Sequence, residues 1–74
     1  MASIRPRPFV PTQRQLQVLA MRCALGSRKE AAYALGISES TVRTHMRLLL
    51  TGSHCVDDAQ ACLMFSRQIH ELET

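Results

Sequence analysis

The sequence contains no long hydrophobic run, because Arg, Gln, Ser or His interrupts its apolar stretches every few residues. A membrane-spanning helix needs about 20 predominantly apolar residues, and a secretory signal needs an uninterrupted apolar centre. The sequence offers neither kind of segment. We therefore expect a cytosolic protein.

Cysteine is scarce and forms no C-x-x-C pair: the three cysteines are Cys23, Cys55 and Cys62. An odd number without such a pair argues against a disulfide framework and against a compact zinc site. His45 or His54 could join these cysteines around a metal ion, but the spacing fits no ordinary zinc module, and cysteine is often a small buried apolar residue. We expect reduced thiols, no metal and no cofactor.

The sequence also lacks the residue arrangements that carry catalysis. It has no Ser/His/Asp or Cys/His arrangement, no glycine-rich loop that could hold a phosphate and no cluster of carboxylates. We expect no enzymatic activity. Alternating apolar and polar runs, hairpin dipeptides and internal repeats are absent as well, which leaves helices as the expected secondary structure.

A chain of 74 residues is long enough for one domain with a modest core. Its formal net charge is +3, and the charge is unevenly distributed. Residues 1–50 hold eight of the nine Lys and Arg residues but only two of the six Asp and Glu residues. The positive part of the chain can attract a polyanion.

Apolar residues recur with a period near 3.6 and predict an all-α domain of four helices. Side chains that can cap a helix start precede each of them: Thr12, Ser27, Ser38 and either Asp57 or Asp58. Glycines follow the first three as stop signals: Gly26, Gly36 and Gly52. The predicted helices are residues 13–25, 28–35, 39–51 and 58–72.

Residues 1–11 contain all three prolines and predict an extended basic arm ahead of a helical domain over residues 12–74. Arg5 and Arg7 lie on this arm. They could enter a minor groove, as the arms of homeodomains do, or belong to a solvated basic tail, which is the simpler interpretation.

The second and third predicted helices form a helix-turn-helix unit over residues 28–47. Ala32 is small where the two helices must cross closely, and Gly36 can adopt the left-handed conformation of the turn. Ile37 and Val42 can pack beneath the turn. In such a unit the second helix enters the major groove of DNA, so the predicted recognition helix is residues 39–50.

The segment SRKEAAYALGISESTVRTH, residues 27–45, resembles the DNA-binding domain of the LuxR/NarL (GerE-like) family. The resemblance extends upstream to TQRQLQVL, residues 12–19, and downstream to DDAQA, residues 57–61. It implies a four-helix LuxR-type domain that binds duplex DNA in the bacterial cytosol or nucleoid. In the family, some of the matching positions contact DNA or support that contact: Lys29, Thr41, Arg43 and His45.

Helical geometry places three polar side chains together on the outer face of the recognition helix. Arg can bond the O6/N7 edge of guanine, and the methyl group of Thr can pack on that of thymine. The predicted base contacts are Arg43, Thr44 and Arg47. The starts of the second and third helices offer backbone N–H groups and polar side chains to phosphates. The predicted phosphate contacts are Ser27, Arg28, Lys29, Ser40, Thr41 and His45.

A line of apolar residues on the last predicted helix has two possible uses, a homodimer seam or packing against the first helix. Its members are Cys62, Phe65, Ile69 and Leu72. We expect both uses, with the first half of the line directed inward and the second half available to a partner.

The sequence therefore predicts a small transcription regulator that binds DNA as a homodimer. The alternative is a protein-binding adaptor that uses the same fold to bind RNA polymerase or to block a LuxR-type regulator. A piece resembling region four of a sigma factor is a third, weaker possibility.

Overall fold

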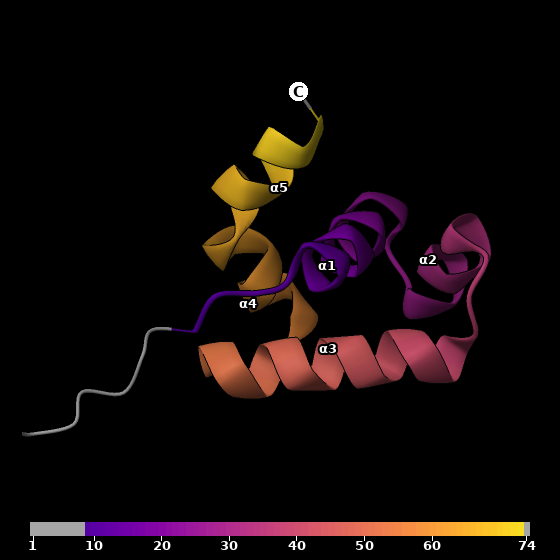
Figure 1. Ribbon diagram of the computed structural model, residues 1–74, viewed down its shortest axis with the longest axis horizontal. Helices are drawn as coiled ribbons and strands as arrows, with labels where there is room; N and C mark the ends of the chain where they lie inside the picture. Colours follow the sequence, from indigo (N-terminus) through magenta and orange to yellow (C-terminus); the bar gives the residue numbers. More distant parts are fainter. Residues whose placement is uncertain (1–8, 74) are drawn as a thin grey trace, which may run out of the picture.

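The computed structural model describes residues 9–73, which form five α-helices and no strand (Figure 1). The helices are α1 (Gln13–Leu25), α2 (Arg28–Leu35), α3 (Glu39–Ser53), α4 (Asp58–Met64) and α5 (Ser66–Glu73). The all-α prediction is confirmed, and the first two helices have the predicted bounds. No helix within the described range is long and apolar enough to cross a membrane.

The predicted caps begin the first four helices. Thr12 and Gln15 form a complete capping box, in which each side chain accepts a hydrogen bond from the other residue's backbone N–H, at 3.0 and 2.9 Å. Ser27 caps α2, Ser38 caps α3 and Asp57 caps α4, each by accepting from the backbone N–H three residues later. Short-range chemistry therefore determines where these helices begin.

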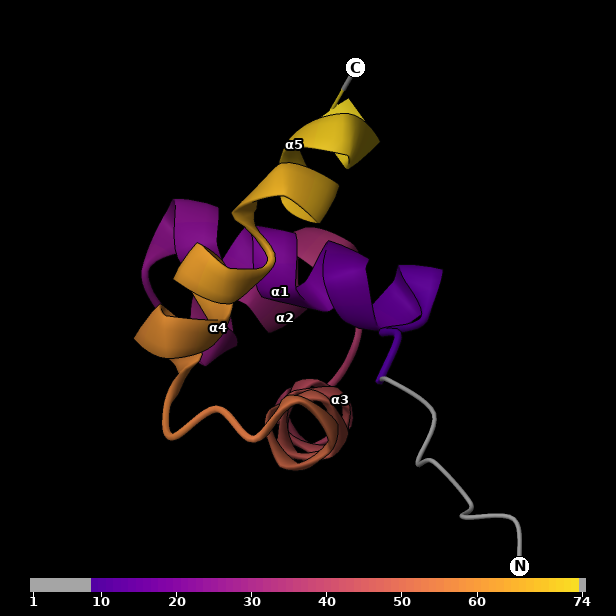
Figure 2. The ribbon, with the colours of Figure 1, turned by 90° about the vertical axis from the view of Figure 1, so that its left-hand side faces the viewer.

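α1 is the central helix, and it contacts each of the other four. α3 is seen along its length in Figure 1 and end-on in Figure 2. α1 is seen nearly end-on in Figure 1 and along its length in Figure 2, so the two helices cross steeply. The buried core joins all elements except α5: Val18, Leu19, Ala32, Val42, Met46, Leu49, Cys55, Ala61 and Phe65. One long flank of α3 is left uncovered along the edge of the molecule (Figure 2).

α3 is longer than predicted, because Gly52 lies within the helix instead of ending it. A Cβ atom at this position would overlap the ring of Phe9, which packs against the core. Gly52 is therefore required for close approach of the N-terminal segment and not as a stop signal. The helix ends after Ser53 and is capped by His54, whose backbone is left-handed at φ 60°.

The last predicted helix is divided at Phe65, whose backbone (φ −104°, ψ 18°) leaves the helical region. The Phe65 side chain is 5% exposed and packs edge-on against Phe9, with ring centroids 6.4 Å apart. No Gly or Pro marks this break, and a periodic pattern of apolar residues continues through it. The break was therefore missed by the sequence prediction.

The prediction of reduced thiols is wrong for two of the three cysteines. Cys23 of α1 and Cys62 of α4 form a disulfide between Cα atoms 6.0 Å apart, across 39 residues of sequence. Cys55 is a free, buried thiol that donates to the sulfur of Met64 at 3.6 Å. The packing of α4 on α1 brings the two distant cysteines together, which their local spacing could not indicate.

The turn between α2 and α3 depends on Gly36, which has φ +68°. Its N–H donates to the carbonyl of Tyr33, and the N–H of Ile37 donates to that of Ala32, so the last carbonyls of α2 are satisfied. Ile37 packs against the core directly after this turn. The direction in which α3 leaves α2 is thus set by one left-handed residue.

Replacing Gly36 with alanine is expected to lower the free energy of unfolding by about 1–2 kcal/mol, because an L side chain disfavours this backbone conformation. A Cβ atom there would meet nothing within 4 Å, so no steric overlap adds to the cost. Urea denaturation measures the change. Gly36→Asn is the control and should lose less, since asparagine tolerates the left-handed region; equal losses in both variants would contradict this explanation.

Candidate nucleic-acid interface

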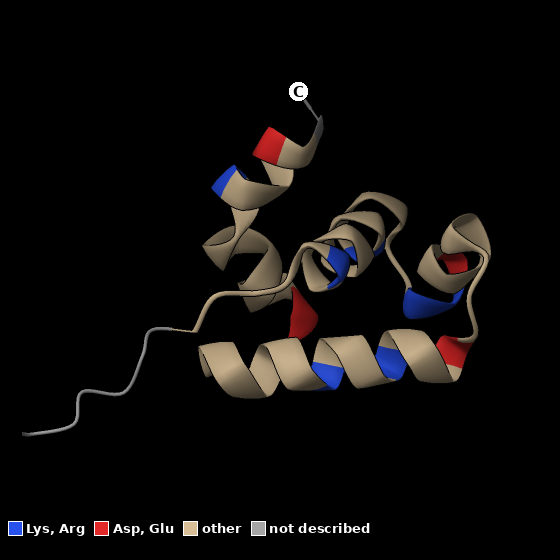
Figure 3. Ribbon diagram, in the orientation of Figure 1, with Lys and Arg blue, Asp and Glu red and all other residues tan. Residues whose placement is uncertain are grey.

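α3 has one face in the core and one face in solvent. Val42, Met46 and Leu49 have no exposed surface. Arg43, Thr44 and Arg47 are exposed, so the three predicted base-contact residues lie together on the outer face of the helix. Figure 3 shows basic segments along α3 and at the start of α2.

The basic side chains of this face have no ion-pair partner within residues 9–73. Arg43, Arg47 and Lys29 form no ion pair or side-chain hydrogen bond with another described residue. A guanidinium that has no internal partner can form two parallel bonds to one acceptor edge without first breaking a contact. The face is therefore suited to bind an external, negatively polarised ligand.

A group of hydroxyls surrounds the start of α3. The Ser38 hydroxyl lies 2.8 Å from that of Thr41 and 3.0 Å from that of Ser40. The Thr44 hydroxyl donates to the carbonyl of Ser40 at 3.0 Å. Because the Thr44 hydrogen is used inside the helix, this side chain offers its methyl group and the oxygen lone pairs to a ligand.

The predicted phosphate contacts fall into two groups. Lys29, Ser40 and Thr41 are exposed, whereas Ser27 and His45 are half-buried. The Ser27 hydroxyl accepts from the N–H of Glu30 at 3.1 Å as the cap of α2. All of these residues except His45, which lies in the second turn of α3, are at the starts of α2 and α3, where unpaired backbone N–H groups favour an anion.

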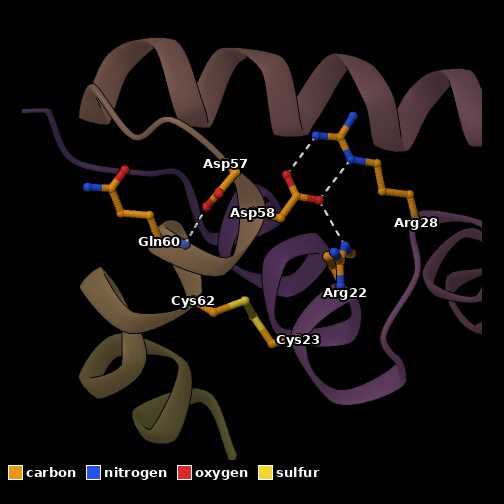
Figure 4. The surroundings of a disulfide bond; sticks show 7 residues. All are labelled: Arg22, Cys23, Arg28, Asp57, Asp58, Gln60 and Cys62. Carbon is orange, nitrogen blue, oxygen red and sulfur yellow. Dashed lines mark hydrogen bonds and ion pairs between the residues drawn. A yellow bond between two sulfur atoms is a disulfide. The ribbon is translucent and has the colours of Figure 1, made fainter.

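Arg28 has a structural partner that the sequence did not reveal. Its Nη2 and Nε donate to the two carboxylate oxygens of Asp58 at 2.7 and 2.9 Å, and Arg22 Nε donates to the same carboxylate at 2.8 Å (Figure 4). Asp58 is 9% exposed. One carboxylate thus joins α1, the start of α2 and the start of α4. The third guanidinium nitrogen of Arg28 that can donate, Nη1, takes no part in these bonds.

The charges of this cluster stabilise each other. The hydrogen bond from Arg28 lowers the pKa of Asp58, and the second bond from Arg22 acts in the same direction, against the opposing effect of burial. The hydrogen bond to Asp58 raises the pKa of Arg28. The sequence signal for this cluster was the pair of adjacent carboxylates, Asp57 and Asp58. One carboxylate is enough to cap the helix, so the other is available for an ion pair.

Two further residues of the α3 surface were missed by the sequence prediction. Leu48 is 51% exposed, and Thr51 is exposed one helical turn beyond Arg47. Both lie beyond the predicted contacts on the half of α3 that faces away from the core. Both residues fall within the predicted helix 39–51, but the prediction assigned DNA contacts only as far as Arg47.

The remaining predicted residues lie away from this face. Cys62 and Phe65 are directed toward α1 and the core, and Ile69 packs against the core from α5. Leu72 is half-buried and borders a shallow hollow along α1. Arg5 and Arg7 lie outside the described residues. Within the described range, no group of three His, Cys, Asp or Glu side chains is arranged to hold a metal ion.

Comparison with known proteins supports the same unit. Residues 11–65 match the family described as bacterial regulatory proteins, luxR family (GerE), and these residues include α1 to α4. No curated protein and no solved structure matches the chain. The matched range contains the complete helix-turn-helix, so the chain belongs to the luxR family of bacterial regulatory proteins, which are DNA-binding regulators.

Proposed function

We propose that this chain is a transcription regulator of the bacterial cytosol that reads duplex DNA with α3 in the major groove. The observation that carries this proposal is the exposed row of Arg43, Thr44 and Arg47, opposite a fully buried face of the same helix. The tight turn at Gly36 fixes this helix relative to α2. A recognition helix must be held in a fixed orientation to contact specific bases in the major groove.

The chemistry of the row favours specific bases. Each Arg guanidinium can donate two hydrogen bonds to guanine, and the methyl of Thr44 can contact that of thymine. A good pairing of this kind discriminates by about 1–3 kcal/mol against the wrong base. We therefore expect an operator in which guanines lie close to a thymine.

Phosphate contacts would hold the domain in register. Lys29 provides an exposed charge, and the hydroxyls of Ser40 and Thr41 lie at the first turn of α3. Arg28, held by Asp58, can present Nη1. These groups position the protein without reading sequence. The complete proposed set is Ser27, Arg28, Lys29, Ser40, Thr41 and His45.

Fluorescence anisotropy with labelled random and selected duplexes tests the function. We expect binding that is tighter to selected than to random duplexes and that weakens steeply with salt, because phosphate contacts release counterions. If the folded protein binds neither duplex at low salt, DNA reading by α3 is excluded. The search would then turn to RNA polymerase or a LuxR-type regulator as the partner.

The proposed regulator acts as a homodimer on two half-sites about one helical turn apart. Of the predicted seam, Cys62 and Phe65 are used within the protomer. The half-buried Ile69 and Leu72 on α5 are the members that a second copy could reach. We therefore assign the dimer contact to the C-terminal half of the seam.

Sedimentation equilibrium of Leu72→Glu tests this contact. We expect the dimer dissociation constant to rise by about tenfold or more, because a charge would be buried in an apolar contact. Leu63→Glu is the matched control, since Leu63 is 79% exposed on α4 and outside the seam. Dissociation by the Leu63 variant alone would place the dimer surface on the outer face of α4 instead.

A further inference from the structure

Two linkages join α1 and α4 side by side. Arg22 and Cys23 are consecutive on α1, and their partners Asp58 and Cys62 are four residues apart on α4. Positions four residues apart are neighbours on one helical face. An ionic bond and a covalent bond therefore hold the same pair of helices, about one helical turn from each other (Figure 4).

The ionic part of this contact extends to the DNA-binding unit. The carboxylate of Asp58 also receives two hydrogen bonds from Arg28, the first residue of α2. α2 leads through Gly36 into α3 and contacts it along the helix-turn-helix. The position of α4 on α1 thus determines whether Asp58 can hold the start of α2.

The three cysteines differ in their access to solvent. Cys23 and Cys62 are half-buried, whereas Cys55 is buried at 9% exposure. A small thiol can reach the linked pair more readily than it can reach Cys55. Cys55 therefore serves as an internal control for reactions of the linked pair with small thiols.

We propose that Cys23 and Cys62 are a reversible redox site that reacts with low-molecular-weight thiols and disulfides and controls how firmly α4 holds the helix-turn-helix. Oxidation by glutathione disulfide begins when one cysteine thiolate attacks a glutathione sulfur and releases one glutathione thiolate, which takes up a proton. The second cysteine thiolate then attacks the mixed disulfide and releases the second glutathione. Two protein thiols become one disulfide, and one glutathione disulfide becomes two glutathione molecules.

The oxidised form is the one in which α4 is covalently fixed. Closing a loop across 39 residues restricts the unfolded chain, and loops of this size give a large stabilisation. In the reduced form, the Asp58 bonds and apolar packing alone hold α4. The start of α2, and with it α3, is then held less firmly.

Glutathione redox buffers applied to the full chain test the site. Maleimide mass labelling after unfolding in urea, which exposes the buried Cys55, should count one reactive thiol in the oxidised protein and three in the reduced protein, since the chain has three cysteines. The melting temperature should fall by roughly 10 °C or more on reduction. DNA affinity should fall by about fivefold or more over the same range of redox buffers.

The cysteine variants distinguish this site from a general effect of the buffer. Cys23→Ser and Cys62→Ser should match the reduced wild-type protein at every redox ratio, whereas Cys55→Ala should retain the full response. Three reactive thiols under oxidising buffer, or a disulfide that changes neither melting nor DNA affinity, would overturn the proposal.

Only the DNA measurement rests on the proposed function. If neither redox form binds DNA, the proposed function fails, while thiol counting and melting still decide whether Cys23 and Cys62 form a redox site that fixes α4. If DNA is bound equally by both forms, the regulation of binding is overturned and the proposed function stands.

Discussion

The double variant Arg43→Ala/Arg47→Ala is expected to lower the affinity for a selected operator duplex by about 100-fold or more. Each arginine can contribute about 1–3 kcal/mol of discrimination through a bidentate contact. Neither side chain has an internal partner among the described residues, so the fold should keep its melting temperature within about 2 °C. Fluorescence anisotropy at several salt concentrations and a circular dichroism melt measure the two quantities.

The matched control is Arg14→Ala/Arg67→Ala, which removes the same charge from exposed positions on α1 and α5. This control should bind the operator nearly as tightly as the wild-type protein. An equal loss in both double variants would indicate attraction by net charge alone and would contradict base reading by α3.

Lys29→Ala separates positioning from reading. It should weaken binding to selected and random duplexes by the same factor and reduce the slope of log affinity against log salt by about 1. The α3 variant should instead reduce the difference between the two duplexes. These distinct signatures follow from the exposed positions of Lys29 at the start of α2 and of the arginines along α3.

The parts of the fold predicted from sequence depend on contacts within a few residues. Thr12 and Gln15 are three residues apart, and so are Ser38 and the N–H that it caps. The outer face of α3 likewise follows from a 3.6-residue period once Val42 and Met46 are assigned to the core. Local chemistry was sufficient for these features because no distant residue alters them.

The parts that were missed depend on residues distant in sequence. Asp58 bonds Arg28 across 30 residues and Arg22 across 36, and the disulfide spans 39. Gly52 was interpreted as a stop signal because nothing near it in sequence shows that Phe9 approaches the helix there. Helical periodicity gives the inward face of each helix but not the side chain that it meets across the core.

The second large effect concerns Asp58. Replacing it with alanine is expected to lower the free energy of unfolding by about 2–4 kcal/mol, because Arg22 and Arg28 would lose their shared partner in a partly buried site. Asp57→Ala is the matched control at the neighbouring position, where the carboxylate only caps α4 and its loss costs about 1 kcal/mol. Urea denaturation of the oxidised proteins compares the two, and equal losses would show that the ion pairs add nothing beyond a cap.

Acid should remove the stabilisation that the ionised Asp58 carboxylate provides. The pKa of Asp58 is lowered in the folded protein, chiefly by the hydrogen bond from Arg28, so its stabilisation is complete above the pKa of the unfolded chain, near 4. Below that value the unfolded chain binds the proton first, and the contribution disappears as the pH falls through the lower folded-state pKa. Arg28 stays charged throughout, because arginine is protonated over this whole pH range and its hydrogen bond to Asp58 raises its pKa further. Unfolding free energies of the wild-type protein and Asp58→Asn, measured from pH 7 downward, should therefore converge in acid. The reason is that the protonated wild-type protein and the amide variant both lack the carboxylate charge. Curves that stay parallel would mean that Asp58 does not titrate below its ordinary range in the folded protein.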